Sequence, residues 1–187
     1  ANGSYALSAN TTGTNNVATG YAALNLNTTG NNNVANGYRA LRSNTTGNNN
    51  VATGYQALYT NTTGASNTAN GYAALYYNTT GSNNTANGYA ALLSNTTGSN
   101  NTANGTNALY ANTTGAGNIG IGPHNSGGTY APVFDPTTEN NRIVMGHTSV
   151  TNAYIQVAWT VVSDARDKTA FAPVNYGLDF VNDLKPT

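Results

Sequence analysis

One 17-residue line decides the fold of this chain: Asn27-Thr28-Thr29-Gly30-Asn31-Asn32-Asn33-Val34-Ala35-Asn36-Gly37-Tyr38-Arg39-Ala40-Leu41-Arg42-Ser43. Its opening Asn-Thr-Thr-Gly recurs every 17 residues, without insertion or deletion, at Asn10, Asn27, Asn44, Asn61, Asn78, Asn95 and Asn112. Strict self-similarity of this kind is the sequence signature of a solenoid or fibre. The repeat therefore predicts an elongated stack of coils.

The composition excludes several classes of function. Only 6% of the 187 residues are charged, against about 25% in an ordinary globular protein. Residues 1–134 contain no acidic residue and only two basic ones, Arg39 and Arg42. This is no electrostatic footprint for nucleic acid or for an anionic membrane. Asn- and Gly-rich composition is also typical of disordered tracts, but a strict period favours an ordered fold.

Two features that the sequence lacks limit the kinds of site that it can form. There is no cysteine, which excludes disulfides and thiolate metal sites, and no apolar run approaches the length of a membrane span. We expect no cofactor, no metal, no nucleic-acid partner and no membrane insertion. The chain starts in mid-repeat and stops in mid-motif, so we expect it to be a fragment.

Each position of the repeat has a recognisable role. Small residues alternate at Ala18 and Gly20, which places one face of a strand against a very close neighbour. The intervening β-branched residue, such as Val34, suits the opposite face. Asn-Thr-Thr-Gly supplies turn chemistry. One large apolar residue recurs in every repeat and forms the predicted core ladder, with Leu24, Leu41, Leu58, Leu75, Leu92 and Leu109 as members.

The coil predicted from this line is narrow. Seventeen residues at about 3.3 Å each give roughly 56 Å of contour, enough for two or three short strands joined by tight turns. Such a coil buries little apolar surface, as small domains generally do. Asparagine ladders along the stack and packing between chains would compensate. We expect an all-β homotrimer in which the small-residue faces meet, through residues such as Ala18, Gly20, Ala35 and Gly37.

The sequence divides into three parts. Residues 1–117 hold seven repeats and form the predicted shaft. Residues 118–162 contain a degenerate rung, a connector and a strand-like run in which Ile155, Val157 and Trp159 share one face. A lone strand of this kind is not stable, so we expect three copies to wind around a common axis as a trimeric β tip. Residues 163–187 form the third part.

Two resemblances to known families follow from these motifs. The pattern Asn-x-Ala-x-Gly resembles the head repeats of trimeric autotransporter adhesins, which are left-handed parallel β-rolls. The third part resembles the opening of an intramolecular chaperone domain of the peptidase S74 type, found in phage tail fibres, in three motifs: Ser163-Asp164-Ala165-Arg166-Asp167-Lys168-Thr169, Tyr176-Gly177-Leu178-Asp179-Phe180-Val181 and Leu184-Lys185-Pro186.

The second resemblance implies assembly and self-processing. Domains of this family trimerise, guide folding of the fibre and in many members cleave themselves off. The cleaved bond would be Ser163–Asp164, with Ser163 as nucleophile and Lys168 as a candidate base. A nucleophile needs such a positioned base. The chain stops at Thr187, so only the beginning of the domain is present, and the protein would otherwise not be an enzyme.

Other candidate sites have plainer interpretations. His124 and His147 fit solvent-facing or interface positions better than a metal site. Asp135 and Glu139 could form a glycosidase pair, but they flank a Pro-Thr-Thr turn, which favours a role in that turn. Asn-x-Thr matches to a glycosylation acceptor are taken as incidental. Four tyrosines are candidates for stacking on sugars, namely Tyr59, Tyr76, Tyr77 and Tyr110.

Three functions remain open at this point. The first is an adhesive trimeric fibre, extracellular or on a virion surface, whose tip binds a cell-surface glycan or protein receptor with avidity. The second is an ice-binding or other single-chain solenoid, which would use a file of threonine hydroxyls at Thr11, Thr28, Thr45, Thr62, Thr79, Thr96 and Thr113. The third is a polysaccharide-degrading tailspike, which lacks carboxylates in the repeats.

Overall fold

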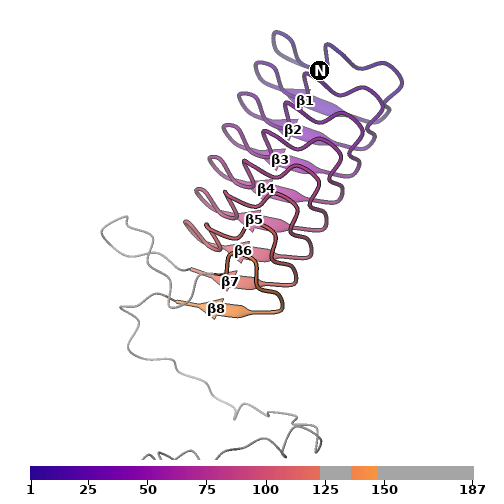
Figure 1. The fold of residues 1–187 in the computed structure, drawn as a ribbon. Helices are drawn as coiled ribbons and strands as arrows, with labels where there is room; N and C mark the ends of the chain where they lie inside the picture. Colours follow the sequence, from indigo (N-terminus) through magenta and orange to yellow (C-terminus); the bar gives the residue numbers. More distant parts are fainter. Residues whose placement is uncertain (123–135, 147–187) are drawn as a thin grey trace, which may run out of the picture. The chain divides into compact units, whose positions relative to one another are not determined.

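The fold is a stack of coils in a parallel β-solenoid. The computed structural model describes residues 1–122 and 136–146, and these contain strands but no helix. Successive repeats wind above one another, one coil per repeat (Figure 1). Each coil contributes a single three-residue strand, and the strands are β1 (Val17–Thr19), β2 (Val34–Asn36), β3 (Val51–Thr53), β4 (Thr68–Asn70), β5 (Thr85–Asn87), β6 (Thr102–Asn104), β7 (Ile119–Ile121) and β8 (Ile143–Met145).

The strands form one sheet in sequence order, and each pairs in parallel with the next. Register follows the repeat, so that Ala18 lies opposite Ala35. An additional bridge between Asn2 and Thr19 extends the pattern by one coil at the N-terminal end. The predicted solenoid is confirmed. The described residues all fall in the first of two compact units, which spans Ala1–Thr151.

The coil contains one strand where the sequence predicted two or three. The reason lies in the Gly-Tyr-x-Ala-Leu segment, whose third and fifth residues adopt positive φ, for example 53° at Gln56 and 52° at Leu58. These residues still bond to the neighbouring coils, since Leu58 donates its N–H to the Ala74 carbonyl at 3.0 Å. The segment is therefore bent rather than extended while its backbone stays paired.

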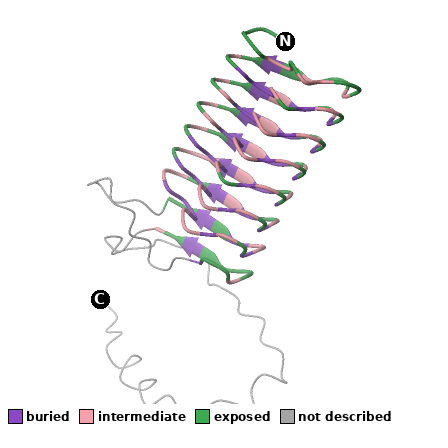
Figure 2. Ribbon diagram, turned by 45° about the horizontal axis from the view of Figure 1, so that its top comes forward, coloured by how far each residue is buried: buried purple, intermediate pink, exposed green. Residues whose placement is uncertain are grey.

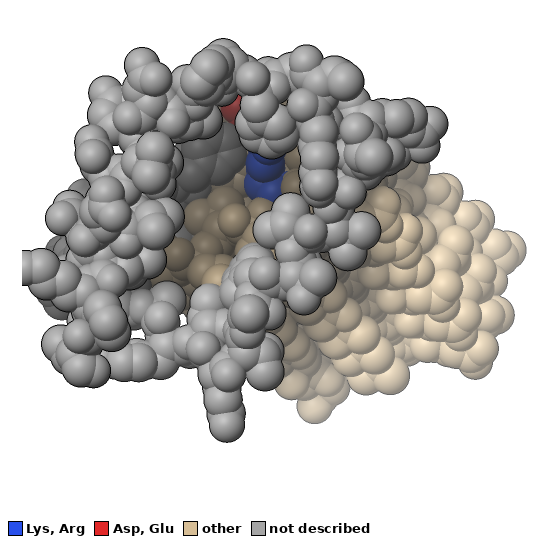
Figure 3. All heavy atoms as spheres, turned by 90° about the horizontal axis from the view of Figure 1, so that it is seen from below, with Lys and Arg blue, Asp and Glu red and all other residues tan. Residues whose placement is uncertain are grey.

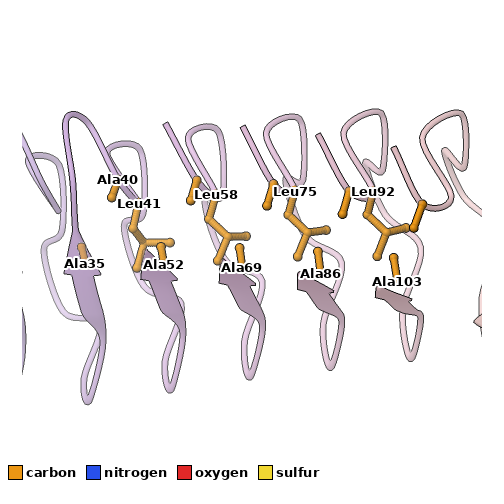
Figure 4. Close-up of a cluster of buried hydrophobic side chains, with 14 of the residues drawn as sticks. Ala35, Ala40, Leu41, Ala52, Leu58, Ala69, Leu75, Ala86, Leu92 and Ala103 are labelled. Atoms are coloured by element: carbon orange, nitrogen blue, oxygen red, sulfur yellow. The ribbon is translucent and has the colours of Figure 1, made fainter. Parts of the chain in front are cut away.

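The leucine ladder fills the interior. Leu58 is fully buried, and its side chain lies beside Ala69 of the next strand (Figure 4). A left-handed conformation costs an ordinary residue about 1–2 kcal/mol. Full burial of a leucine contributes about 1.5–3 kcal/mol. Burial thus offsets the backbone strain, which explains why the same coil position accepts leucine in repeat after repeat.

The small-residue face lies inside the coil. Ala18 and Ala35 are buried within their own chain and pack with the leucine ladder, and the strands carry this buried row (Figure 2). Gly20 approaches the next coil so closely that a Cβ there would lie 2.6 Å from the Gly37 carbonyl oxygen. These residues were expected at contacts between chains. They mediate contacts between coils of one chain instead, so other residues form the outer surface.

A first asparagine ladder runs through the interior. Asn61 is fully buried. Its Nδ2 donates to Oδ1 of Asn44 at 2.8 Å and to the Gly64 carbonyl at 3.0 Å. Its Oδ1 accepts from Nδ2 of Asn78 at 2.7 Å. Because buried polar groups are costly when left without partners, this repeated bonding makes asparagine the residue that the position requires.

A second ladder uses the asparagine that precedes each strand. The backbone N–H of Asn67 donates to Oδ1 of Asn50 at 3.0 Å, and Nδ2 of Asn67 donates to the Gly81 carbonyl at 2.8 Å. Side chains thereby bond to backbone groups of a neighbouring coil. The two ladders supply the stabilisation along the stack that the thin apolar core lacks.

Residues 136–146 form one more coil, which the sequence analysis assigned to the connector and tip. Thr113 bonds to Thr137, 24 residues away, so the usual spacing of 17 is exceeded by seven (24 − 17). Val144 takes the buried alanine position in β8 with 3% exposure. It pairs with Gly120 of β7, where a Cβ would lie 2.5 Å from Leu109 Cγ. Gly120 therefore leaves room for the last leucine of the ladder.

Candidate functional site

Stacked tyrosines form a file on the coil surface next to the sheet. Tyr38 and Tyr55 stack with ring centroids 5.1 Å apart and an interplanar angle of 9°. Tyr55 and Tyr72 continue the file at 4.9 Å. The rings remain about two-fifths to half exposed. This spacing follows from the coil repeat, because parallel strands lie about 4.8 Å apart, which is also a favourable distance for aromatic pairs.

Three of the four tyrosines expected to bind sugars contact one another. Tyr59 and Tyr76 stack at 5.0 Å, and Tyr77 meets Tyr76 edge-on at 4.6 Å. Tyr110 occupies the same coil position as Tyr59 and Tyr76, but Leu93 intervenes in the file. Burial is the main cause that raises the pKa of Tyr76, followed by the neighbouring Tyr59. Tyr77 is half exposed, whereas Tyr59, Tyr76 and Tyr110 are more buried.

Two arginines lie against the tyrosines. The guanidinium carbon of Arg39 lies 5.0 Å from the Tyr38 ring centroid and 6.0 Å from that of Tyr21. The guanidinium carbon of Arg42 lies 5.7 Å from the Tyr59 ring centroid. All three distances fall within the range of cation–π attraction. In the described coils neither guanidinium has a hydrogen bond or a carboxylate partner, and Nε of Arg39 is buried without a hydrogen bond.

A hollow opens beside these arginines. It has a volume of about 210 Å³, and its walls are Tyr5, Tyr21, Ala22, Asn25, Arg39 and Arg42. Seen from the end of the stack, the visible flank of the coils is almost entirely uncharged (Figure 3). The hollow combines aromatic rings, an amide and two cations, which are the only Lys, Arg, Asp or Glu side chains in residues 1–122. Sequence reasoning missed it, although both arginines were recognised as the only charges of the repeats.

The threonine file proposed for ice binding is already engaged. Oγ1 of Thr28 donates to the Thr45 carbonyl at 3.0 Å, and Oγ1 of Thr62 donates to the Thr79 carbonyl at 3.0 Å. These hydroxyls close the Asn-Thr-Thr-Gly turns onto the next coil. Toward water, these hydroxyls present only acceptor lone pairs, and both Thr28 and Thr62 are half-buried.

Glu139 belongs to a turn. Its carboxylate accepts the backbone N–H groups of Thr137 at 2.8 Å and Thr138 at 3.2 Å. Hydrogen bonding from its own backbone N–H and from these two groups lowers the pKa of Glu139. Such bonding is what the Pro-Thr-Thr turn needs, as the sequence indicated. Asp135, its proposed partner in a glycosidase pair, lies outside the described residues.

The remaining sequence-based site residues also lie outside the described part of the chain. These are the self-cleavage residues Ser163, Asp164 and Lys168, the tip residues Ile155, Val157 and Trp159, and the two histidines, His124 and His147. Within residues 1–122 and 136–146, no group of His, Cys, Asp and Glu side chains could hold a metal ion. The same residues contain no helix long and apolar enough to cross a membrane.

Comparison with known proteins gives no relative: no family model, no curated protein and no solved structure matches this chain. The described coils carry stacked phenol rings, three guanidinium groups, one carboxylate and many amides. Phenol rings, guanidinium groups and amides are groups that bind ligands.

Proposed function

We propose that this chain is part of a homotrimeric adhesive fibre, displayed on a cell or virion surface, in which the solenoid is the shaft. Residues 118–162 would include the trimeric tip, which presents a binding site for a glycan or protein receptor. The register-locked ladders support the shaft role, because each coil contacts only its neighbours and the stack can lengthen without a new core.

The observation that carries the proposal is an apolar patch on the outer face of the sheet. Ile119 and Ile121 of β7 are 38% and 46% exposed, and Ile143 and Met145 of β8 are 59% and 47% exposed. Parallel pairing places Ile119 beside Ile143 and Ile121 beside Met145. Contiguous exposed apolar side chains of this kind mark interaction surfaces.

We assign this patch to further copies of the same chain. The outer positions carry Thr or Asn in β4–β6, and Val with Thr or Asn in β1–β3. Among the described strands, both outer positions are therefore apolar only in β7 and β8. In the sequence, the strand-like run of residues 150–162, which is predicted to pair between three chains, begins five residues after Met145.

The native mass of the chain tests the assembly. We expect a trimer for the wild type and a monomer for Ile119→Asp/Ile143→Asp, because charges would be buried without partners at the contact. The matched control, Thr85→Asp/Thr102→Asp, changes the same strand position in polar coils and should remain a trimer. A monomeric wild type would overturn the proposal.

Self-processing by the third part needs its own test on the protein that carries the complete chaperone domain. Mass spectrometry would compare that protein with its Ser163→Ala variant. Loss of the C-terminal piece only when Ser163 is intact supports cleavage at Ser163–Asp164. Equal length in both proteins would remove the self-cleavage and leave the fibre intact.

A further inference from the structure

We propose that the hollow beside Ala22 is a binding site for an anionic sugar residue, such as a sulfated or carboxylated unit of a polysaccharide. In this arrangement Arg39 and Arg42 receive the negative group, while Tyr5, Tyr21 and Asn25 contact the sugar ring. All six lining residues belong to one chain. The proposed site therefore does not depend on the proposed trimer or on its tip.

The repeat itself explains why a hollow forms here. Coil positions 17 residues apart lie above one another, so Tyr5, Ala22, Arg39 and Gln56 form one file. Ala22 is the one small member between two long side chains. Its methyl group forms the floor, while Tyr5 and Arg39 rise on either side. The walls are completed by the neighbouring file, in which Asn25 precedes Arg42.

The charge of the hollow calls for an anion. No acidic residue exists between residues 1 and 134 to balance the two guanidinium groups. The groups are oriented by aromatic rings and not by hydrogen bonds. Guanidinium donors in this state can bind a carboxylate or a sulfate oxygen through two parallel hydrogen bonds. An inorganic anion could also bind to the two guanidinium groups, but it would make no stacking contact with Tyr5 and Tyr21.

The aromatic walls favour a ring-shaped ligand. Tyr5 is 63% exposed and meets Tyr21 of the neighbouring file at an interplanar angle of 81°. Within that neighbouring file, the consecutive tyrosines from Tyr21 to Tyr89 stack within 13° of parallel. The rings of Tyr5 and Tyr21 consequently do not cover each other face to face. The volume of about 210 Å³ lies below the roughly 300–1,000 Å³ of pockets for drug-sized ligands. It therefore suits one sugar unit of a longer chain.

The test measures binding of the chain to three polysaccharides: dextran sulfate as the sulfated probe, polygalacturonate as the carboxylated probe and dextran as the neutral one. We expect binding to at least one anionic polymer, weakening as salt is added, and none to dextran. The two anionic probes distinguish sulfate from carboxylate recognition. Binding to neither, or equal binding to dextran, would overturn the proposal.

The variants borrow residues that the chain already uses at the same coil positions. Arg39→Gln copies Gln56, and Arg42→Tyr copies Tyr59. The double variant should keep the thermal melt of the wild type and bind the anionic polymer at least tenfold more weakly. Retention of wild-type affinity by this folded variant would refute the site.

A second pair of variants separates the hollow from general charge attraction. Ala22→Gln keeps both arginines but fills the floor, and should also weaken binding at least tenfold. Ala73→Gln makes the same change at an equivalent position, also buried and with the same φ of 52°, away from the arginines. It should bind like the wild type. If Ala22→Gln does so too, the hollow is not the binding site.

Discussion

Removing one buried amide from the shaft should be far more costly than its size suggests. In Asn61→Ala, three hydrogen bonds are lost, namely those to Asn44 Oδ1, from Asn78 Nδ2 and to the Gly64 carbonyl. Each bond contributes about 1 kcal/mol net, so the free energy of unfolding should fall by about 3 kcal/mol. The Gly64 carbonyl retains one partner, since Nδ2 of Asn50 donates to it at 2.9 Å. This limits the penalty.

An acidic replacement separates hydrogen bonding from packing. In Asn61→Asp the carboxylate has nearly the shape of the amide but cannot donate, and it would face Oδ1 of Asn44. Burial raises the folded-state pKa of such a carboxyl group above its unfolded value. The free energy of unfolding of Asn61→Asp is therefore greatest below the unfolded pKa of this carboxyl group and falls as pH rises through the folded pKa. Acidification should partly rescue this variant.

The assay is guanidinium unfolding of the full chain, read together with amide hydrogen exchange because repeat arrays can unfold in parts. Asn70→Ala is the matched control. Asn70 lies on the exposed side of the coil, where its Nδ2 donates to Asn87 Oδ1 at 2.9 Å, and its loss should cost about 1 kcal/mol or less. If Asn61→Ala were no more destabilising than this control, the interior ladder could not be a main source of stability.

Three other changes test the core, the coil spacing and the surroundings of Tyr76. Leu58→Ala should lower the free energy of unfolding by about 2–5 kcal/mol, measured by the same assay; a loss below 1 kcal/mol would show that the ladder is not tightly packed. In Gly71→Ala, an alanine would have to adopt a φ of 133°, and its Cβ would lie 2.5 Å from the Gly88 carbonyl oxygen. Backbone strain and overpacking should lower the free energy of unfolding by about 2–5 kcal/mol. A soluble variant as stable as the wild type would contradict this coil spacing. Because the pKa of Tyr76 is raised in the folded state, the contribution of this phenol to stability is complete below the unfolded pKa and is lost as pH rises through the folded pKa. Alkaline difference absorbance should show a late-titrating phenol that disappears in Tyr76→Phe. An unchanged titration in that variant would contradict the raised pKa of Tyr76.

Much of the shaft could be predicted from the sequence because translation by 17 residues places like residues together. The leucine ladder and the asparagine ladders both follow from that rule. The number of strands does not, because positive φ at Gln56 and Leu58 is locally unfavourable. Only burial and the bonds to adjacent coils stabilise it. Local patterns give no signal for such a conformation.

The final coil was missed for a different reason. Residues 136–146 keep Thr137-Thr138, Asn140-Asn141 and Gly146 of the repeat, but a seven-residue excess breaks the period before them. An alignment that allowed one insertion would have found this coil. The hollow could not be predicted from single residues, because it depends on residues 17 apart in the sequence. In the file Tyr5, Ala22 and Arg39, a small side chain lies between two long ones.

The first asparagine ladder, the one that contains Asn61, has a direction and a defined end. Each Nδ2 donates toward the preceding coil, so every coil presents the same upper and lower surface to its neighbours. At the end, Pro136 stands where the next asparagine would be, and Nδ2 of Asn118 crosses over to Oδ1 of Asn112 at 3.1 Å. Whole 17-residue units could therefore be gained or lost by recombination without disturbing any bond pattern. The length of the shaft would then change in steps of about 4.8 Å, while the same final coil could end a shaft of any length.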